Sequence, residues 1–252
     1  MVKSHRPRLD QEMVTRGLCA SREKAQRAIM AGLVTVNGQP ARKPGERVKP
    51  EDVVAVEAPE KYVSRGGHKL EHALRHFNLD VTGFVAVDLG ASTGGFTDCL
   101  LQAGARRVYA VDVGHGQLAW RLREDPRVVC MDRTNARSLT PASFPQPYTP
   151  ADLVVIDCSF ISLRKILPAA IAILGASGKI VALIKPQFEA GKAEADRGQG
   201  VITDPQVHQR VLADLHAFVT SQPGLRWRGV TASPLLGPAG NKEFLVLIEK
   251  TA

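Results

Sequence analysis

Residues 84–98 read Phe-Val-Ala-Val-Asp-Leu-Gly-Ala-Ser-Thr-Gly-Gly-Phe-Thr-Asp, and this stretch decides the fold of the larger part of the chain. Its apolar run predicts a buried strand, its small residues predict a sharp turn, and a helix is expected to begin at Gly95. Glycines in such a turn let a ligand lie against the backbone, where a Cβ atom would block it. A tight turn without a ligand is the plainer reading, but so many small residues favour a bound nucleotide-like molecule.

The spacing of these glycines weighs against one class of nucleotide. Dinucleotide-binding enzymes carry Gly-x-Gly-x-x-Gly at this place. Gly90 and Gly95 fit the outer positions, but Ser92 stands where the middle glycine must let a pyrophosphate approach. An NAD-linked enzyme is therefore disfavoured, although these residues alone leave it open.

Strand and helix patterns alternate after residue 64 and predict a mostly parallel sheet with helices on both faces. Two late strands, Arg228–Pro234 and Phe244–Glu249, have no obvious helix between them and predict an antiparallel hairpin at one edge. We therefore expect an α/β domain with a Rossmann-like, doubly wound fold. The other predicted strands are Val85–Leu89, Arg107–Val111, Val128–Met131, Leu153–Ile156 and Ile180–Ile184, and the predicted helices are Gly95–Ala103, His115–Leu122, Leu163–Leu174 and Pro205–Ser221.

Ionisable side chains stand at the carboxyl ends of the predicted strands, where such sheets bind ligands. Asp112 lies 112 − 90 = 22 residues beyond Gly90, close to the roughly 20-residue offset at which an acid meets a ribose diol. Asp132 opens a polar run, Asp-Arg-Thr-Asn, from which a side chain could reach an adenine edge. Asp157 and Lys185 follow runs buried on both faces, where an unpaired charge is costly. They either pair only with each other or belong to a catalytic cluster.

Residues 8–58 show a different pattern. Apolar residues from Leu9 to Leu18 recur at helical spacing, and Ser21 is expected to cap a second helix over Arg22–Ala31. Val34-Thr-Val-Asn-Gly predicts a hairpin with a type I′ turn, and a short strand is expected over Val53–Glu57. These pieces predict a small α+β unit.

The order of these pieces resembles the S4-type RNA-binding domain, also called the αL motif. The matching text includes Arg8-Leu-Asp, Ser21-Arg-x-x-Ala and Gly32-x-Val-x-Val-Asn-Gly. The resemblance implies that basic side chains contact folded RNA by shape and phosphate position, which agrees with the hidden base edges of A-form RNA. A solvated helix face is the plainer reading for any single arginine, whereas the set favours RNA. The RNA-contacting candidates are Arg8, Arg16, Arg22, Lys24, Arg27 and Lys43, together with Arg65 at the start of the next domain.

The turn over residues 88–94, Asp-x-Gly-x-Ser-x-Gly, resembles the first motif of S-adenosylmethionine (SAM) methyltransferases. Ser64-Arg-x-x-x-Lys-Leu and the later Lys242-Glu resemble the FtsJ/RrmJ group of RNA 2′-O-methyltransferases. With the S4-type unit in front, almost the full chain resembles the TlyA family, also called haemolysin A. The resemblance implies a catalytic tetrad of Lys69, Asp157, Lys185 and Glu243. The implied SAM contacts are Asp88, Gly90, Ala91, Ser92, Thr93, Gly94, Gly95 and Phe96, to which Asp112 and Asp132 are added from their strand ends.

The resemblance also names the methyl acceptor, because the TlyA family methylates a cytidine ribose in bacterial ribosomal RNA. Ribosomal RNA or ribosomal subunits are therefore the expected partner, with the large subunit first and the small subunit as a further candidate. In this mechanism Lys185 accepts or steers the proton of the ribose hydroxyl, and Asp157 and Glu243 fix the two lysines. Other acceptors fit less well: residues 157–160 read Asp-Cys-Ser-Phe, without the Pro-Pro of amine methyltransferases, and Cys158 lacks the Pro-Cys context of base-carbon methylation.

Composition sets outer limits on the function. The chain has 252 residues and a net charge of +8, which favours a polyanionic partner, nucleic acid first and an anionic membrane surface second. No run approaches the roughly 20 apolar residues of a membrane span, and the first residues lack the apolar core of a signal peptide. The four cysteines are scattered, so neither a metal site nor a disulfide framework is expected. A cytoplasmic protein fits best.

The expected organisation is an S4-type domain over 1–58, a linker over 59–63 and a methyltransferase domain over 64–252, in a monomer or a homodimer. Two alternatives to an enzyme stay open. One is an RNA-binding ribosome-assembly factor with a degenerate methyltransferase fold, which predicts missing glycines or tetrad residues. The other is a haemolysin, which would need an amphipathic or spanning segment and an export signal.

Overall fold

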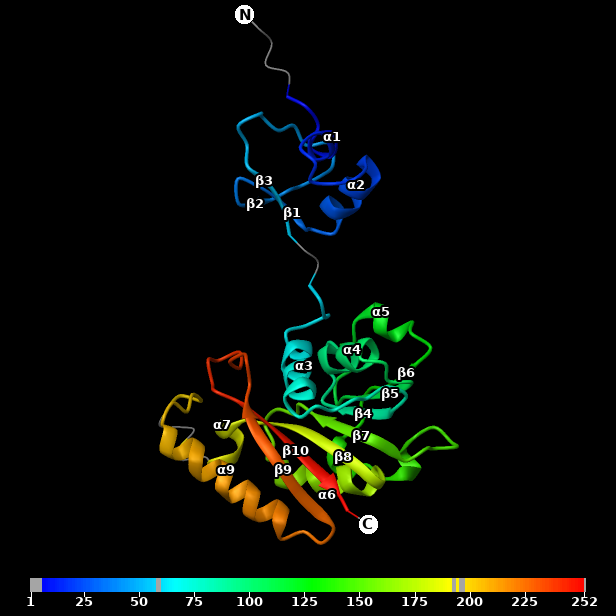
Figure 1. Cartoon of the computed structure of the whole chain (residues 1–252), viewed down its shortest axis with the longest axis vertical. Helices are drawn as coiled ribbons and strands as arrows, with labels where there is room; N and C mark the ends of the chain where they lie inside the picture. The colour runs from blue at the N-terminus through cyan, green and yellow to red at the C-terminus, as the bar shows by residue number, and fades with distance from the viewer. Residues whose placement is uncertain (1–5, 58–59, 192–193, 195–197, 252) are drawn as a thin grey trace, which may run out of the picture. The chain divides into compact units, whose positions relative to one another are not determined.

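The computed structural model describes residues 6–57, 60–191, 194 and 198–251. The chain divides into two compact units, Met1–Lys61 and Tyr62–Ala252 (Figure 1). The predicted linker residue Pro59 lies outside the described residues. Tyr62, for which packing is the plainer role, is 4% exposed and lies against Gly67 in the second unit.

The first unit packs two helices, α1 (Leu9–Thr15) and α2 (Arg22–Met30), on a small antiparallel sheet. The sheet has the order β2-β1-β3, with β1 Val34–Val36, β2 Gln39–Pro40 and β3 Val54–Val56. Ser21 caps α2 as predicted, because its hydroxyl accepts a hydrogen bond from the Lys24 amide. Asn37 and Gly38 both have positive φ, as the predicted type I′ turn requires.

The second unit is built on a seven-stranded sheet of order β6-β5-β4-β7-β8-β10-β9. The first five of these strands run parallel, and β10 is antiparallel to both of its neighbours. The predicted antiparallel pair at one edge of the sheet is therefore confirmed. The strand bounds are β4 Val85–Leu89, β5 Arg107–Val111, β6 Val128–Met131, β7 Ala151–Ile156, β8 Leu174–Ile184, β9 Leu225–Ala232 and β10 Phe244–Lys250.

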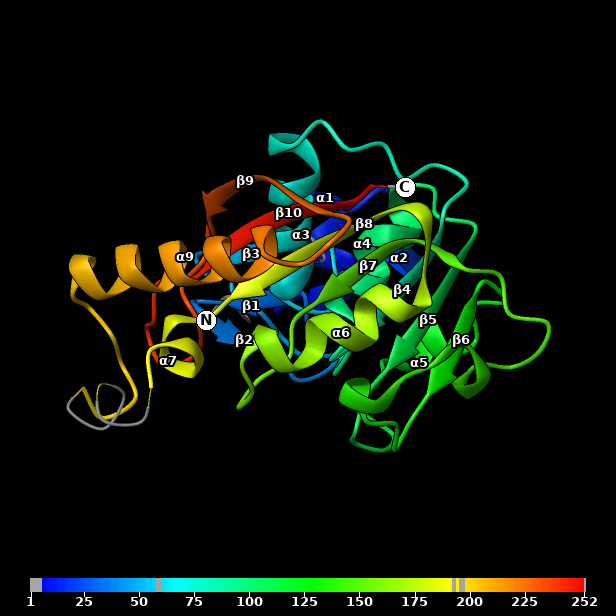
Figure 2. The same ribbon diagram turned by 90° about the horizontal axis from the view of Figure 1, so that it is seen from below.

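Two helical layers cover the faces of this sheet (Figure 2). Alternate residues of β4 enter different cores: Val87 packs with α6 and α9, whereas Ala86 packs with α3 and α4. This alternation follows from the two-residue period of a strand, and it explains why β4 is apolar on both faces. The helices are α3 Gly66–His76, α4 Gly95–Gln102, α5 Trp120–Arg123, α6 Leu163–Ile173, α7 Pro186–Glu189 and α9 Pro205–Thr220, and two 3₁₀ turns cover Ala136–Ser138 and Pro141–Ser143.

One predicted helix is wrong in extent. The sequence predicts a helix over His115–Leu122, but α5 spans only Trp120–Arg123. The preceding loop is held by two carboxylates instead: the Gly114 amide donates to Asp112 and the Gly116 amide donates to Asp132. Gly116 also has a φ of 71°, which a helix does not allow. Asp112 is a neighbour of Gly114 in sequence, whereas Asp132 follows β6 and reaches Gly116 only in the tertiary fold, which a local pattern does not show.

Candidate active site

The four residues of the implied tetrad line one cavity of about 280 Å³ together with the glycine turn. Lys69 comes from α3, Asp157 follows β7, Lys185 follows β8 and Glu243 precedes β10. Their strands are neighbours in the sheet, which brings segments far apart in the sequence to one edge. The turn contributes its residues from Gly90 to Phe96, with Gly94 set behind the cavity wall.

The tetrad forms two ion pairs. Lys69 Nζ lies 2.5 Å from Glu243 Oε2, and Lys185 Nζ lies 2.6 Å from Asp157 Oδ1. The Lys185 ammonium also donates to the Ser159 hydroxyl at 2.9 Å. Both lysines are 8% exposed and Glu243 is 1% exposed, so the charges lie in partly dry surroundings. Asp157 and Lys185 therefore pair with each other, and both also border the cavity that Lys69 and Glu243 line.

Glu243 carries an unsatisfied acceptor. Among the described groups its buried Oε1 atom has no hydrogen-bond partner. Gly237 packs directly against this atom, because a Cβ at Gly237 would lie only 2.5 Å from it. The carboxylate is thus confined between Gly237 and Lys69, with its orientation fixed from both sides.

A second cavity of about 490 Å³ adjoins the first and shares four wall residues with it, Gly90, Ser92, Asp157 and Ser159. Its walls combine Asp112, Thr134 and Asn135 with apolar side chains such as Ile161 and Ile166. This mixture and size are typical of a small-molecule site.

Gly90 shows why the turn needs glycine. Its φ is +86°, and a Cβ would lie 2.9 Å from the Asp157 carbonyl oxygen. The turn after β4 therefore runs directly against the end of β7, leaving the space above it to a ligand. A nucleoside cofactor such as SAM fits this donor set, since a carboxylate, an amide and a hydroxyl face an apolar slot.

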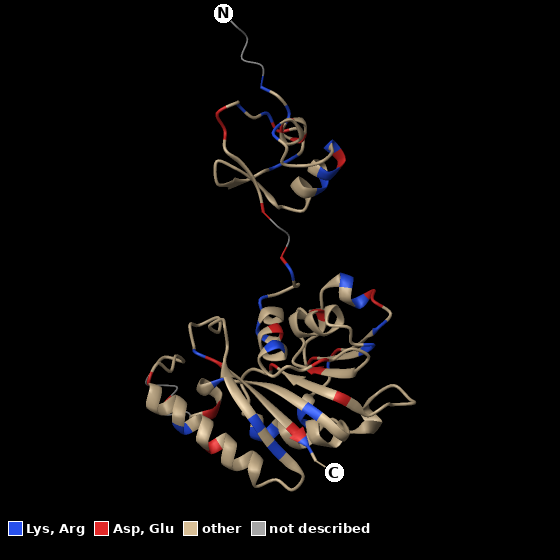
Figure 3. Cartoon of the chain, in the orientation of Figure 1, with Lys and Arg blue, Asp and Glu red and all other residues tan. Residues whose placement is uncertain are grey.

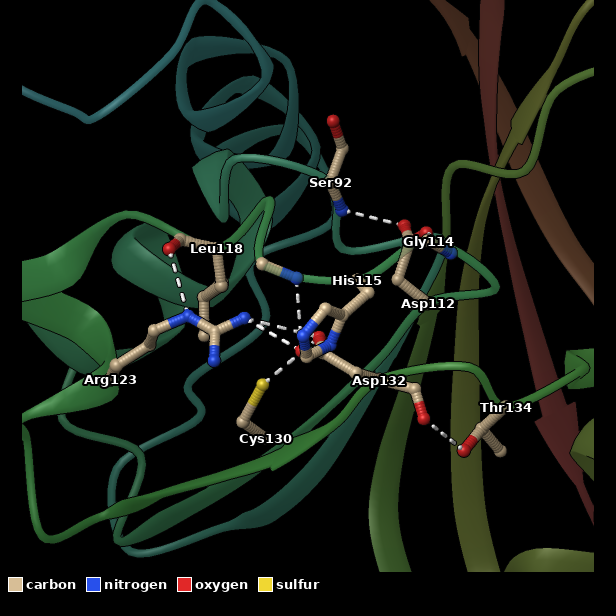
Figure 4. Close-up of polar contacts among 10 residues, drawn as sticks. Ser92, Asp112, Gly114, His115, Leu118, Arg123, Cys130, Asp132 and Thr134 are labelled. Carbon is tan, nitrogen blue, oxygen red and sulfur yellow. Dashed lines mark hydrogen bonds and ion pairs between the residues drawn. The ribbon is translucent and has the colours of Figure 1, made fainter.

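Asp112 lies at the wall of the second cavity and organises the turn (Figure 4). Its Oδ2 accepts a hydrogen bond from the Ser92 amide at 2.8 Å, and its Oδ1 accepts one from the Gly114 amide at 2.7 Å. Ser92 has a positive φ of 49°, and the bond to Asp112 holds this conformation. A carboxylate oxygen accepts more than one bond, so Asp112 retains the capacity to bind a ribose.

Asp132 points elsewhere. Its carboxylate pairs with Arg123 at 2.8 Å and with His115 at 2.9 Å, and it also accepts from the Gly116 amide (Figure 4). The bond from Arg123 holds the pKa of Asp132 well below its usual range. The cavity wall is formed instead by Thr134 and Asn135, from the same polar run. Sequence reasoning found the right strand end, but the structure does not bring Asp132 to the cavity.

Asp88 lies beneath the turn, fully buried, and lines neither cavity. Its Oδ2 accepts from the Thr97 amide at 2.9 Å and from the Thr97 hydroxyl at 2.7 Å, while Oδ1 has no partner among the described groups. Burial raises the pKa of Asp88 to about 7, opposed by the Thr97 hydroxyl. Asp88 therefore ties β4 to α4 and supports the turn from below.

Cys158 has the properties of a packed residue. Burial raises the pKa of its thiol to about 12, and its Sγ atom lies 3.4 Å from the Leu89 carbonyl oxygen. A thiol in this state stays protonated, whereas a nucleophilic cysteine must ionise. The geometry does not support base-carbon methylation through Cys158.

The predicted RNA contacts of the first unit fall into two groups. Asp10, which is fully buried, accepts hydrogen bonds from Arg8, Arg22 and Gln26. Arg16 donates to the carbonyl oxygens of Lys49, Pro50 and Asp52 and so anchors the segment before β3. These three arginines hold the fold of the unit. The candidates with exposed side chains and no such role are Lys24, Arg27 and Lys43.

Two site features are missing from the sequence-based prediction. Phe160 is 91% exposed with a positive φ of 63°, and it lines the second cavity. Its ring centroid lies 5.2 Å from that of Phe188, whose ring in turn lies 6.0 Å from Lys185 Nζ. Arg65, predicted only as an RNA contact, lines the tetrad cavity. The sequence signal that could have indicated Phe160 is an aromatic residue in the polar loop directly after β7, three residues beyond Asp157.

Within the described part of the chain, no group of three or more His, Cys, Asp or Glu side chains is placed to hold a metal ion. None of the described helices is both long and apolar enough to cross a bilayer.

Comparison with known proteins identifies the family. The FtsJ-like methyltransferase model matches residues 62–250, and the S4 domain model matches residues 7–54. YqxC of Bacillus subtilis is 48% identical over 244 residues, covering 96% of this chain and 85% of the relative. The 16S/23S rRNA (cytidine-2′-O)-methyltransferase TlyA of Mycobacterium tuberculosis is 47% identical over 247 residues, covering 96% and 90%.

A solved structure from Streptococcus thermophilus, which carries a hemolysin name, has a TM-score of 0.73 at 45% identity and covers 98% of this chain and 90% of its own. The two family models together span most of both units, and the range of the methyltransferase model includes the four positions of the tetrad. The chain therefore belongs to the TlyA family of FtsJ-like methyltransferases with an N-terminal S4 domain, as its sequence motifs predict.

Proposed function

We propose that this protein transfers the methyl group of SAM to the 2′-hydroxyl of a cytidine ribose in ribosomal RNA, in the cytoplasm. One observation carries the proposal: two lysine–carboxylate pairs border a cavity that shares its wall with a glycine-lined nucleoside site. Large-subunit RNA is the first expected substrate and small-subunit RNA the second.

The second cavity is the proposed SAM site. When bound there, SAM supplies an electrophilic methyl group on a sulfonium centre. Asp112 would bind the ribose hydroxyls, Thr134 and Asn135 lie where an adenine edge would be read, and Ile161 and Ile166 offer an apolar surface to the base. Gly90 and Ser92 lie on the wall shared by both cavities, so the reacting groups would meet beside them.

The tetrad cavity is the proposed acceptor site. A ribose hydroxyl is a poor nucleophile and must lose its proton as it attacks. Lys185 is held by Asp157 and Ser159, so its ammonium has a fixed direction toward the cavity. We assign Lys185 to accept that proton as a neutral amine or to steer it by hydrogen bonding as an ammonium, and the Lys69–Glu243 pair to complete the opposite wall. Correct in-line placement by itself supplies several kcal/mol of barrier reduction.

Phe160 suits the base of the acceptor nucleotide. An exposed aromatic ring beside the reacting groups offers a stacking surface, which is typically worth about 1–3 kcal/mol per base. Stacking does not choose among bases, so the proposed preference for cytidine rests on the substrate in the name of the M. tuberculosis relative. The S4 unit, with Lys24, Arg27 and Lys43 exposed, would bring folded RNA to the site.

The complete site favours an enzyme over an inactive assembly factor. That alternative predicts missing glycines or tetrad residues, whereas both lysine–carboxylate pairs and the Gly90 turn are intact. The haemolysin alternative would need a membrane-active segment, and no helix among the described residues is long and apolar enough to cross a membrane.

The deciding experiment is transfer of labelled methyl from SAM to large and small ribosomal subunits purified from cells that lack this gene. We expect label in 23S RNA, recovered after nuclease digestion as 2′-O-methylcytidine. Label on a base, or on protein alone, would contradict the proposal. Label in 16S RNA alone would keep the chemistry and reverse the order of substrates.

A further inference from the structure

A strip of basic side chains leads away from the tetrad cavity along the methyltransferase unit. It combines the exposed side of α3 with the edge strand β9, and we name it the α3–β9 strip. Its members are Arg65, His68, His72, Arg75, His76, Arg226 and Arg228. We propose that this strip binds phosphates of the ribosomal RNA segment that flanks the methylated nucleotide, an inference that rests on the proposed function.

Contacts between α3 and β9 make the strip continuous. His72 Nε2 lies 3.2 Å from the Thr231 hydroxyl, and a Cβ at Gly229 would lie 3.4 Å from the Phe77 ring. The rings of His72 and His76 stack with centroids 5.9 Å apart. Helix α3 starts at the cavity, where Lys69 pairs with Glu243, and its 11 residues carry the strip about 16 Å away from it.

The charge of the strip matches a polyanion. Arg65, Arg75, Arg226 and Arg228 are all exposed, and Figure 3 marks Lys and Arg positions in blue on both α3 and β9. Two acids lie beside them: Glu249, whose Oε2 is 3.2 Å from Arg228 Nε, and Glu71, whose Oε2 is 3.8 Å from His68 Nδ1. Four arginines against two glutamates leave 4 − 2 = +2 before any histidine is charged. Neutralised phosphates release counterions, which is the main source of affinity for RNA.

A plainer reading of the two β9 arginines is protection of an edge strand. Strand β9 ends the seven-stranded sheet, and charged side chains on an edge discourage pairing with another chain. That role does not explain why the basic residues continue over α3 to the mouth of the cavity, where Arg65 lines the wall. An RNA strand whose ribose occupies this cavity must leave it along a neighbouring surface, and this surface carries the complementary charge.

The test compares two double variants of equal charge change. Arg226→Gln with Arg228→Gln removes two cations of the strip. Arg106→Gln with Arg107→Gln removes two exposed arginines at the amino end of β5, the sheet edge opposite to the one that binds ligands. Binding of large-subunit RNA is measured by filter retention over a series of salt concentrations, alongside methyl-transfer kinetics.

For the strip variant we expect the slope of log affinity against log salt to fall by about two, roughly one per lost phosphate contact. KM for RNA should rise by about tenfold or more, with kcat within about twofold of wild type, because the tetrad is untouched. The β5 variant should retain the wild-type slope and KM. Replacing Arg226 and Arg228 by lysine should restore the slope, since point charges still neutralise phosphates.

An unchanged slope in the strip variant, or an equal loss in the β5 variant, overturns the proposal. If the strip instead bound an acidic protein, the Arg226→Gln, Arg228→Gln variant would bind RNA like the wild type, and the proposal would be overturned in the same way. Failure of the proposed function looks different, because the wild-type protein would then transfer no methyl to RNA at all.

Discussion

The two units of this protein each bury one aspartate completely, and the surroundings of the two are opposite. In the S4 unit Asp10 accepts hydrogen bonds from Arg8, Arg22 and Gln26, and the bond from Arg8 holds its pKa well below the usual range. In the methyltransferase unit Asp88 is bonded only by Thr97, and burial raises its pKa to about 7. The same side chain is thus held as an ion in one unit and close to neutrality in the other.

The contrast shows where each unit places its cations. The S4 unit directs arginines inward to a carboxylate, so those charges stabilise the fold. The methyltransferase unit leaves Asp88 without a cation and directs Lys69 and Lys185 to a cavity, each with its own carboxylate. Arginines therefore support the fold of the first unit through Asp10, whereas in the second unit two lysine–carboxylate pairs border a cavity.

The largest expected effect separates chemistry from folding in the second unit. Lys185→Ala should lower kcat for methyl transfer by about 10³-fold, the usual scale for a positioned proton-transfer group. Binding of SAM and of RNA should stay within about threefold, as measured by calorimetry and filter retention. Lys179→Ala, in the middle of β8, is the matched control and should be active. Near wild-type turnover in Lys185→Ala would remove Lys185 from the reaction.

The converse substitution in the first unit should harm the fold and spare the catalytic centre. Asp10→Ala leaves Arg8 and Arg22 without their shared acceptor and should cost the S4 unit about 2 kcal/mol. Hydrogen–deuterium exchange should then accelerate in α1 and α2 and remain unchanged in the sheet of the second unit. Glu23→Ala, an exposed acid on α2, should change neither. If the amides of α1 and α2 exchange no faster in Asp10→Ala than in the wild type, the hydrogen bonds of Asp10 are not needed for the fold of the S4 unit.

A third substitution sharpens the assignment within the cavities. Asp112→Ala should weaken SAM binding by about tenfold or more, because a charged hydrogen-bond acceptor at the cavity wall is lost. Asp132→Ala should have the smaller effect on the dissociation constant, since Asp132 is engaged by Arg123 and His115. Isothermal titration calorimetry measures the SAM dissociation constant of both variants. An unchanged dissociation constant for Asp112→Ala would remove Asp112 from the SAM site. An equal loss of affinity in Asp132→Ala would place Asp132 in that site.

The smallest expected effect concerns the pH dependence that Asp88 imposes. The native state keeps the Asp88 proton up to about pH 7, whereas an ordinary aspartate with a pKa of 3.8 loses it much earlier. Between about pH 4 and pH 7 the native state therefore binds more protons than the unfolded state, so Asp88 lowers the free energy of unfolding as the pH rises through this range. Asp88→Asn cannot ionise, so its melting temperature should exceed that of the wild type by several degrees at pH 8.

The difference between wild type and Asp88→Asn should shrink toward zero at pH 5, where both side chains are neutral in the folded protein. Thermal unfolding at the two pH values measures it. An equal shift at both values would show that the Asp88 effect is steric and not ionic.

The fold followed closely from sequence because its signals are local. Residues 85–87 of β4, 153–156 of β7 and 180–184 of β8 are apolar throughout, and the residues that make the Gly90 turn and the Ser21 cap are adjacent in the sequence. The helix at residues 115–122 failed for the opposite reason, since Asp132, at the end of the neighbouring strand β6, accepts the hydrogen bond of the Gly116 amide. Local periodicity does not see a competing acceptor that arrives through the tertiary fold.

The candidate site was only partly predictable. The family resemblance named the tetrad, but it did not say that Lys69 pairs with Glu243 and Lys185 with Asp157. Nor did a count of basic residues show that Arg8, Arg16 and Arg22 are committed to the S4 fold. The acceptor that a lysine or arginine side chain reaches depends on its rotamer and on distances in the folded protein, and the spacing of residues along the sequence does not specify either.

The Lys69–Glu243 pair has a consequence for how the protein is made. Its two members are separated by 174 residues, and Glu243 stands just before β10, the last strand of the chain and an interior member of the sheet. During synthesis the S4 unit can fold early, whereas the sheet and its acceptor pocket stay incomplete until the final strand leaves the ribosomal exit tunnel. The acceptor pocket therefore forms only when β10 joins the sheet beside β8 and brings Glu243 to Lys69.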